Sequence, residues 1–405
     1  MSKKREREAP HKLKRRSADT IPPAVRVRST RGGVGREAPP VKQNGVTAKL
    51  RLVRPSSATR ASKLGTQEKL RIYRMMVRVR AMEERMLSLQ RQGRIGFYGS
   101  SYGQEAATLA SAAALAPEDW IFPGLREASA MLLRGYPLIP WLAQLFGNQG
   151  DPTKGRQMPS HQGDRGVHQA SWSSVIGTQL PQAVGAAYAA KLRGEKTVVA
   201  AYFGDGATSS AAFSQALLFA RSLAAPVVFC CQNNHWSISV PLSRQTAETR
   251  LFKKGEAFGI ESRRVDGNSV DDVYEATTAA VARGRAGHGP VLLEFDTYRL
   301  GAHSSSDDPT RYRDQKEVDA WLLKEPIARA KRELVAAGAW TESKDRALQK
   351  EAAESIAAGI VAAESFPPPP PESLFEDVYD QASWLLAEQR GQLLEELAAA
   401  PRQRP

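Results

Sequence analysis

Two consecutive buried strands, each followed by polar residues, constrain the fold of this chain more than any other feature. The residue pattern predicts a strand over 196–203, a helix over 209–223 and a second strand over 226–232. The first strand runs into Gly204-Asp205-Gly206 and the second into Asn233-Asn234. A right-handed strand–helix–strand crossover returns the second strand beside the first and parallel to it. Both carboxyl ends then lie at the edge where open sheets of this kind bind ligands.

These strand ends predict a metal site. Asp205 and Asn234 are 29 positions apart in the sequence, yet the crossover brings them to one edge. A carboxylate oxygen and an amide oxygen suit magnesium, which keeps waters and takes further ligands from substrate phosphates. We expect Gly204 to allow a tight turn and Gly206 to let backbone amides approach a diphosphate. Taken singly, Gly-Asp-Gly is usually a turn and Asn-Asn a strand-ending cap, so the prediction rests on their occurring together.

Helices alternate with strands along the body, which predicts an α/β fold with a parallel sheet and helices on both of its faces. The predicted helices cover 66–92, 104–115, 127–133, 180–192, 270–283, 316–338 and 342–364, and a third strand covers 290–296. Five prolines follow Phe366 and predict a stiff spacer, after which a closing helix covers 373–400. We therefore expect a tail at 1–64, a folded domain at 65–365, and the spacer with its helix at 366–405.

The basic charge of the chain is confined to its first residues. The net charge is +14, and residues 1–63 hold 18 of the 57 basic and 4 of the 43 acidic residues, which leaves 39 of each sign in the remainder. Residues 1–63 contain no aromatic side chain and cannot bury enough apolar surface to offset their ordering entropy, so we expect a disordered basic tail. The absence of aromatic residues among the charges also argues against nucleic-acid binding.

Further features bear on the compartment. An Arg-rich, acid-poor start agrees with a mitochondrial transit peptide, but the run Lys-Lys-Arg-Glu-Arg-Glu at 3–8 is not the usual beginning of one. We therefore expect a cytoplasmic, bacterial-type protein rather than one of the mitochondrial matrix. The two adjacent cysteines, Cys230 and Cys231, exclude a disulfide framework and a multi-cysteine zinc site. The stretches 166–190 and 222–243 carry no charge, but their buried amides would cost too much in lipid, so we expect no membrane span.

Several motifs together resemble a known family. Gly204-Asp205-Gly206, 26 further residues and then Asn233-Asn234 resemble the thiamine-diphosphate fingerprint. Other motifs between about Leu70 and Tyr312 extend the likeness, namely Gln90–Ile95, Gly103–Ala106, Gly155–Pro159, Gly177–Gly185 and Tyr298–Ser304. The chain resembles the alpha subunit of the decarboxylating first component of 2-oxoacid dehydrogenase complexes, the branched-chain type more than the pyruvate type. The resemblance implies a parallel-sheet thiamine-diphosphate-binding fold and an oxidoreductase that decarboxylates a 2-oxoacid and acylates a lipoyl group.

The resemblance also implies roles for individual residues. Asp205 and Asn234 match magnesium ligands, with the backbone carbonyl of Trp236 as the third. The positions that match residues lining the cofactor are Leu125, Arg126, Ser174, Ile176, Gly204, Asp205, Gly206, Ala207, Asn234, Arg299 and His303. His303 further matches an active-site residue near the substrate carboxylate and the incoming lipoyl group. Ser173, Thr178 and Gln179 match a potassium site of branched-chain members.

Three positions need separate comment. Gln232 stands where some members have an arginine on the diphosphate, and Leu125 replaces a common aromatic residue, so both bear on cofactor affinity. Ser304 matches a position that is phosphorylated in animal relatives, but nothing else in this sequence assigns that switch to the chain.

The resemblance implies partner proteins as well. In this family a separate beta subunit supplies the glutamate that activates the cofactor, so we expect an alpha2-beta2 heterotetramer that works with a lipoyl-bearing acyltransferase core. A pyruvate or acetoin dehydrogenase alpha subunit is the alternative within the same chemistry. A non-catalytic nucleic-acid-associated protein is the alternative from another class, which the basic tail favours and which the intact Asp205, Asn234, Arg126 and His303 oppose.

Overall fold

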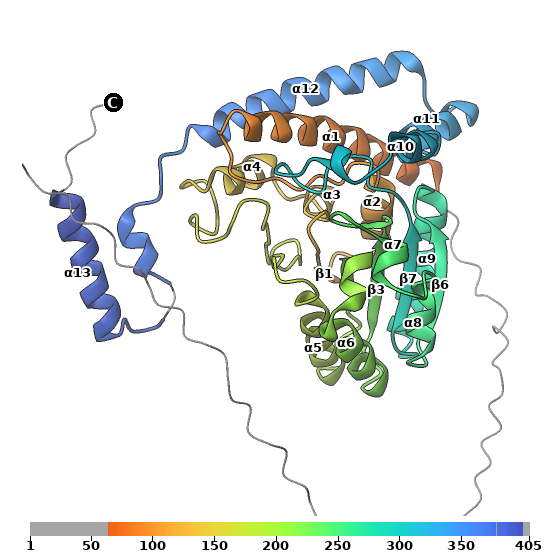
Figure 1. Cartoon of the computed structure of the whole chain (residues 1–405), viewed down its shortest axis with the longest axis horizontal. Coiled ribbons are helices and arrows are strands. Elements are labelled where there is room, and N and C mark those ends of the chain that lie inside the picture. The colour runs from red at the N-terminus through yellow and green to blue at the C-terminus, as the bar shows by residue number, and fades with distance from the viewer. Residues whose placement is uncertain (1–63, 378, 400–405) are drawn as a thin grey trace, which may run out of the picture. The chain divides into compact units, whose positions relative to one another are not determined.

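A five-stranded parallel sheet forms the centre of the computed structural model, which describes residues 64–377 and 379–399 (Figure 1). Across the sheet the strands are β1 (Trp120–Phe122), β2 (Val199–Gly204), β3 (Val227–Asn233), β7 (Val291–Asp296) and β6 (Glu261–Asp266). Every neighbouring pair is parallel. The predicted fold class is therefore confirmed for the body, and the predicted disordered tail lies outside the described residues.

Helices precede, follow and connect these strands. The α-helices are α1 (Thr66–Arg91), α2 (Glu105–Ala113), α3 (Ala130–Leu133), α4 (Leu138–Phe146), α5 (Gln179–Leu192), α6 (Ala211–Ser222), α7 (Leu242–Gln245), α8 (Phe252–Glu256), α9 (Val270–Arg285), α10 (Gln315–Leu322), α11 (Pro326–Ala336), α12 (Glu342–Glu364) and α13 (Trp384–Ala399). Three 3-10 turns, η1 (Asp205–Ser209), η2 (Pro309–Arg311) and η3 (Pro371–Phe375), and a small antiparallel hairpin, β4 (Trp236–Ser237) with β5 (Val240–Pro241), complete the described chain. Within that part, no helix combines the length and the apolar character that a membrane span needs.

The two faces of the sheet bury alternate side chains of the same strands. Ala200 and Tyr202 of β2 join one core with α1, α2 and α9, whereas Ala201 and Phe203 join another with α5 and α6. This is the expected result of a strand whose successive side chains point to opposite faces. A strand covered on both sides needs a continuous apolar run, which explains why the sequences of β2 and β3 lack alternation.

A third core joins α1 to α4 and α12. The second half of α1 packs against α4 and α12 through a cluster that includes Met86, Trp141 and Ile356. Figure 1 shows α12 lying along α1. The proline segment then returns to the body, because the carbonyl of Pro367 accepts a hydrogen bond from the backbone N–H of Gln149 at 2.9 Å.

The sequence pattern missed both edge strands. β1 is only three residues long, and β6 (sequence ESRRVD) is largely exposed, with Val265 as its one buried residue. The helix predicted over 316–338 is divided in two, since Pro326 lacks a backbone N–H and begins α11. The last helix begins at Trp384 rather than 373, after the short turn η3.

Candidate active site

The Asp205 carboxylate is buried at the carboxyl edge of the sheet. It follows β2 directly, is 1% exposed, and its Oδ2 atom has no hydrogen-bond partner among the described residues. Its backbone carbonyl accepts hydrogen bonds from Thr208 Oγ1 at 2.8 Å and Gln245 Nε2 at 2.7 Å, which fixes the turn. Burial raises the pKa of this carboxyl to about 6, although the charges of Arg299 and Arg126 act in the opposite direction. An orphaned, buried carboxylate oxygen is costly unless a cation completes it.

Asn234 lies at the end of the neighbouring strand. The pairing of β2 with β3 places Gly204 opposite Gln232, so Asp205 and Asn234 leave the same edge of the sheet. The Asn234 side chain donates to Gln104 Oε1 at 3.0 Å and accepts from the backbone N–H of Trp236 at 3.2 Å. The predicted convergence of the two strand ends is thus present in the fold.

Two buried arginines meet at His303. Arg126 donates through Nη2 to the His303 carbonyl at 2.9 Å and lies 3.3 Å from its Nδ1, and Arg299 Nη1 lies 3.4 Å from the same nitrogen. Arg299 also donates to the Ile238 carbonyl at 2.7 Å and to Tyr312 Oη at 2.8 Å. Burial lowers the pKa of Arg126 to about 10, with the charge of Arg299 as the next cause. Neither arginine has a close carboxylate partner among the hydrogen bonds of the described chain, so the pair favours an anion.

His303 is held neutral by the same surroundings. Burial, followed by the charges of Arg126 and Arg299, lowers its pKa to about 3. Its backbone N–H donates to Asp307 Oδ2 at 2.7 Å, and Tyr312 Oη donates to the same oxygen at 2.5 Å. The neutral ring can donate a hydrogen bond through one nitrogen and accept one through the other. A bound diphosphate that balanced the charges of Arg126 and Arg299 would raise the pKa of His303 toward neutrality, where a general acid–base residue works best.

The two glycines of the fingerprint differ in what they require. A Cβ on Gly206 would lie 2.3 Å from Ser237 Oγ, so only glycine fits there without movement. Gly204 has φ −83° and ψ 169°, and a Cβ there would meet nothing within 4 Å. Gly204 was expected to allow a tight turn, but its backbone conformation is open to any residue, so nothing in this turn depends on glycine at 204. Ala207, the next predicted residue, is buried in the core with α5 and α6.

The remaining predicted cofactor residues lie in the loop before α5, except for Leu125, which follows β1. Ser174 is exposed and its Oγ lies 2.8 Å from His161 Nε2, while Ile176 is 64% exposed. A Cβ on Gly177 would lie 2.6 Å from Ser210 Oγ, so this loop abuts the turn that follows Asp205. Leu125 is partly buried and packs over Gly99, where an added Cβ would lie 2.6 Å from its Cδ1.

The predicted potassium ligands are not gathered by shared hydrogen bonds. Ser173 Oγ accepts from the backbone N–H of Val175 at 3.3 Å, and Gln179 Nε2 donates to the Tyr202 carbonyl at 2.7 Å. Gln179 Oε1 is buried and has no hydrogen-bond partner within 64–377 and 379–399, and Thr178 is partly buried. A free oxygen on Gln179 is compatible with a cation, and the assignment stays a prediction.

Three residues with close contacts to this site were not assigned roles from the sequence. Gln104 accepts a hydrogen bond from the Asn234 side chain, and Tyr312 accepts one from Arg299. Asp307 accepts one from the backbone N–H of His303. Gln104 and Tyr312 lie within or beside the quoted motifs. No local pattern predicts that Gln104 contacts Asn234, 130 positions away at the end of β3.

The residues present fit a magnesium–diphosphate ligand. Four buried polar atoms around this edge have no partner among the described residues, namely Gln104 Nε2, Asp205 Oδ2, Gln232 Oε1 and Arg299 Nε. Gln232, which replaces an arginine of some family members, turns away to donate to Thr108 Oγ1 at 2.9 Å. The described residues hold no cluster of three or more His, Cys, Asp or Glu side chains arranged for a metal. A magnesium ion at this edge would therefore have one protein carboxylate and otherwise neutral oxygens as its protein ligands. Magnesium accepts such a set when phosphate oxygens complete its shell.

Comparison with known proteins identifies the family. The family model described as "Dehydrogenase E1 component" matches residues 73–372. The chain is 41% identical over 335 residues to "2-oxoisovalerate dehydrogenase subunit alpha, mitochondrial" of Mus musculus, covering 82% of this chain and 76% of the mouse protein. It is 43% identical over 329 residues to the protein of the same name from Caenorhabditis elegans, covering 81% of this chain and 76% of that protein. The Arabidopsis thaliana subunit alpha 1 is 41% identical over 337 residues, which cover 83% of this chain and 71% of the plant protein.

These relatives correct the predicted location and establish the predicted family. The expected cytoplasmic location is wrong, because the mouse, nematode and plant relatives are all named as mitochondrial, which points to a mitochondrial location. The family match and the identity over four-fifths of the sequence agree with the motifs and with the fold. The chain therefore belongs to the dehydrogenase E1 component family, as an alpha subunit of the branched-chain 2-oxoacid dehydrogenase type.

Proposed function

We propose that this chain is the alpha subunit of a branched-chain 2-oxoacid dehydrogenase and binds thiamine diphosphate with magnesium at the carboxyl edge of its sheet. The observation that carries the proposal is the buried Asp205 Oδ2, which has no partner among the described residues and lies in the field of Arg126 and Arg299. The named relatives are 2-oxoisovalerate dehydrogenase subunits, so the pyruvate and acetoin alternatives are not favoured.

Each residue of the site has a distinct task in this proposal. Asp205, Asn234 and the carbonyl of Trp236 are the protein ligands of magnesium. Arg126 and Arg299 balance the charge of the diphosphate, with backbone groups at Gly206 and Ala207 beside it. Because these groups are fixed by burial and hydrogen bonds before the ligand arrives, little reorganisation is needed at the moment of reaction.

The rest of the chemistry is divided between ligand and protein. When bound, thiamine diphosphate supplies the electron sink that allows a 2-oxoacid to lose carbon dioxide. His303 lies between Arg126 and Arg299, and a diphosphate that balanced their charge would raise its pKa from about 3 toward the range in which its ring nitrogens exchange a proton near the substrate carboxylate and the lipoyl group. Ser174 and Ile176 line the end of the cofactor away from the diphosphate, and Leu125 lines it beside Arg126.

The assembly and the domain limits are part of the proposal. An alpha subunit of this family works with a beta subunit, and we infer an alpha2-beta2 enzyme that delivers its acyl group to a lipoyl-bearing acyltransferase. Ser173, Thr178 and Gln179 form a potassium site beside the cofactor loop. Residues 65–365 form the catalytic domain, which agrees with the family match over 73–372, and residues 366–405 extend from it.

Binding of the cofactor to the reconstituted alpha2-beta2 enzyme tests the site. We expect Asp205→Ala to lower the affinity for thiamine diphosphate in the presence of magnesium by at least about 100-fold, because the only charged ligand of the ion is removed. Asp319→Ala, which removes an exposed carboxylate on α10, is the matched control and should leave the affinity unchanged. Calorimetry that finds equal affinity in Asp205→Ala and wild type would exclude this metal site.

A further inference from the structure

We propose that Glu83, a buried glutamate of α1 outside the cofactor site, is a positioning residue that holds the segment 98–102 against Arg126 and the loop bearing His303. The proposal rests on the proposed function, because the parts that it positions are those assigned to the diphosphate and the substrate. Glu83 is 4% exposed, and no cation forms an ion pair with it in the described chain. Burying a carboxylate without a paired cation carries a desolvation penalty, and hydrogen bonds that its oxygens accept offset part of that penalty.

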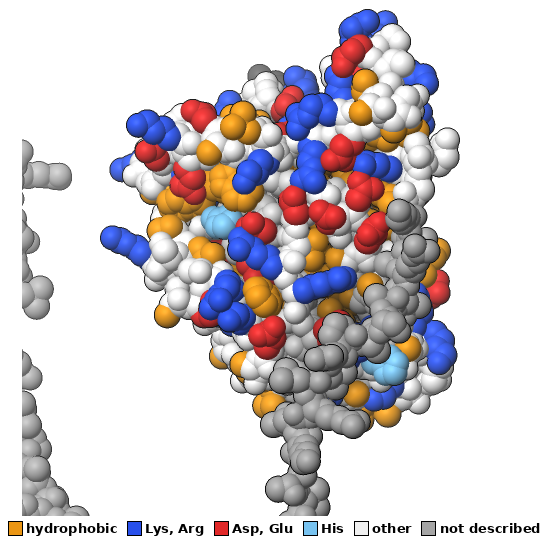
Figure 2. All heavy atoms as spheres, turned by 90° about the vertical axis from the view of Figure 1, so that its right-hand side faces the viewer, with side chains coloured by type: hydrophobic (Ala, Val, Ile, Leu, Met, Phe, Trp, Pro, Cys, Tyr) orange, Lys and Arg blue, Asp and Glu red, His pale blue; other side chains and the backbone are white. Residues whose placement is uncertain are grey.

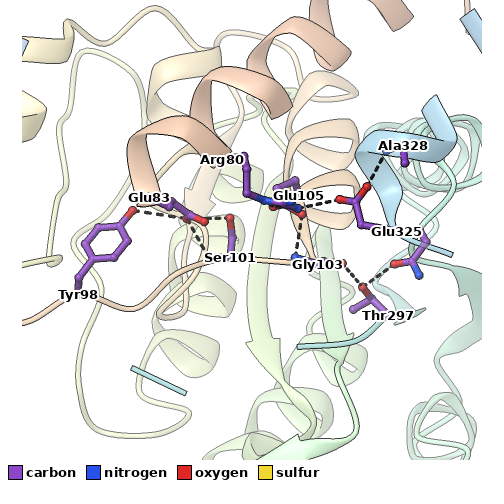
Figure 3. A network of polar contacts seen from close by, with 10 residues as sticks. Arg80, Glu83, Tyr98, Ser101, Gly103, Glu105, Thr297, Glu325 and Ala328 are labelled. Atoms are coloured by element: carbon purple, nitrogen blue, oxygen red, sulfur yellow. Dashed lines mark hydrogen bonds and ion pairs between the residues drawn. The ribbon is translucent and has the colours of Figure 1, made fainter. Parts of the chain in front are cut away.

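The first link is from α1 to the segment. Glu83 Oε1 accepts hydrogen bonds from the backbone N–H of Ser101 at 2.8 Å and from Ser101 Oγ at 2.9 Å, with Tyr98 Oη at 3.5 Å (Figure 3). A single carboxylate oxygen therefore fixes the segment at Ser101 and touches it again at Tyr98. Glu83 Oε2 is buried and has no partner among the described residues.

The second link is from the segment to the site. The Ser100 carbonyl, between the two residues that Glu83 holds, accepts a hydrogen bond from Arg126 Nη1. The Tyr98 backbone pairs with Ser305, since Tyr98 N donates to Ser305 Oγ at 3.1 Å and Ser305 N donates to the Tyr98 carbonyl at 2.9 Å. A third bond joins Leu300 N to the Tyr102 carbonyl at 3.1 Å. The segment thus holds both sides of the loop that contains His303.

A second acid holds the next turn and shows how Glu83 differs. Glu105 accepts from the backbone N–H of Gly103 at 2.9 Å, and its charge is paired with Arg80, which also binds Glu325 (Figure 3). Glu83 lacks such a partner, and Glu105 adds a second negative charge nearby. Burial and then the charge of Glu105 raise the pKa of Glu83 to about 7, while Ser101 and the charge of Arg80 act in the opposite direction. Tyr98 and Arg126 are the other titratable groups in its field.

Three substitutions separate positioning from simple packing. Glu83→Ala removes both acceptor oxygens, whereas Glu83→Gln keeps one carbonyl oxygen for Ser101. Glu84→Ala makes the same change one position along α1, where the side chain is exposed, and is the matched control. All three are measured as alpha2-beta2 assemblies, first without cofactor by amide hydrogen exchange and then by thiamine diphosphate binding.

Without cofactor, we expect Glu83→Ala to speed exchange at least about tenfold at the amides of Ser305 and Leu300, which contact the segment but not Glu83. Glu83→Gln should stay within about threefold of wild type, and Glu84→Ala should be unchanged. With cofactor, Glu83→Ala should weaken thiamine diphosphate binding about tenfold or more. A purely structural role would lower the melting temperature of Glu83→Ala and leave these two amides and the affinity of the folded enzyme unchanged.

The outcomes for the two proposals are distinct. Wild-type enzyme that fails to bind thiamine diphosphate contradicts the proposed function, whatever Glu83 does. Wild-type enzyme that binds it, together with unchanged exchange at Ser305 and Leu300 in Glu83→Ala, contradicts the positioning role alone. If Glu83→Ala does not assemble, faster exchange at Ser305 in Ser101→Ala supports the inference, and unchanged exchange there overturns it.

Discussion

Burial, more than charge pairing, sets the protonation of individual side chains around this site. It raises the pKa of Glu83 to about 7 and of Asp205 to about 6, and it lowers that of His303 to about 3. In each case the shift favours the neutral form, as expected for groups withdrawn from water. A diphosphate with magnesium would reverse part of this cost at Asp205, since it adds the cation that the carboxylate lacks.

The raised pKa of Glu83 predicts how its substitution changes stability with pH. The pKa rises from 4.5 to about 7 on folding, so the carboxyl contributes stability below about pH 4.5 that is lost as the pH rises through 7. Glu83→Gln cannot ionise. Its free energy of unfolding relative to wild type should therefore increase by about 2–3 kcal/mol between about pH 5 and about pH 8. Urea unfolding at both pH values checks this, and a constant difference would show that Glu83 titrates normally.

The two glycines beside Asp205 give a matched pair. A Cβ at 206 meets Ser237 Oγ at 2.3 Å, whereas one at 204 meets nothing within 4 Å. Gly206→Ala should lower the free energy of unfolding by about 1–3 kcal/mol, and Gly204→Ala should change it by less than about 0.5 kcal/mol. Ser237→Gly should restore part of the loss in Gly206→Ala. Equal stability of the two alanine variants would show that the turn yields at Ser237 without cost.

At the residue scale, the sequence could place Asp205 and Asn234 at neighbouring strand ends but not the side chains that contact them. Asp205 and Asn234 follow long apolar strands, so their meeting follows from the topology of one crossover. Gln104 reaches Asn234 from the residue that precedes α2, and Glu83 reaches Ser101 from α1. Such contacts depend on tertiary packing that no local pattern encodes. Gly204 and Gly206 were each assigned a role that glycine makes possible, although only at position 206 does a neighbour, Ser237, leave no room for a Cβ.

At the scale of elements, the central strands were predictable and the edges were not. β2 and β3 are covered on both faces, so their sequences are continuous apolar runs up to the polar residues at the carboxyl end of β3. β6 pairs on one side only and its exposed residues are charged, which is how edge strands avoid further pairing. β1 has three residues, too few for a periodic signal. The division of the helix at Pro326 could have been read from the proline itself.

The loop after β7 gives a prediction at this scale. Asp307 accepts hydrogen bonds from the backbone N–H of His303 and from Tyr312 Oη, and so closes the loop on itself. Asp307→Ala should increase trypsin cleavage after the exposed Arg311 several-fold in the free enzyme, because the loop then opens more often. Asp319→Ala, on the exposed face of α10, should cleave as wild type does. An unchanged rate in Asp307→Ala would show that contacts elsewhere hold the loop.

At the scale of the whole molecule, the excess positive charge lies in residues 1–63 of the sequence, and the remainder of the chain is balanced. Residues 64–405 carry 39 basic and 39 acidic residues. Figure 2 shows basic and acidic side chains interspersed with hydrophobic ones on the part of this face that grey atoms do not cover. A body of this kind should associate with its beta subunit through apolar contacts rather than through long-range attraction.

Removal of residues 1–63 tests this separation. The truncated chain should assemble with the beta subunit and keep its turnover, and the assembly should depend only weakly on salt, because the remaining charge is balanced. Sedimentation at about 0.05 M and about 0.5 M salt measures the effect. Dissociation of the truncated tetramer at the higher concentration would show that charge holds the subunits together.

Steady-state turnover of the reconstituted alpha2-beta2 enzyme tests the central claim most directly. The acceptor is the lipoylated acyltransferase, the cofactors are thiamine diphosphate and magnesium, and the competing substrates are 3-methyl-2-oxobutanoate and pyruvate. We predict turnover that requires both cofactors and a kcat/KM at least about tenfold higher for 3-methyl-2-oxobutanoate, since a branched side chain gains about 1–3 kcal/mol in a pocket shaped for it. A preference for pyruvate, or turnover that does not need thiamine diphosphate, would contradict the account.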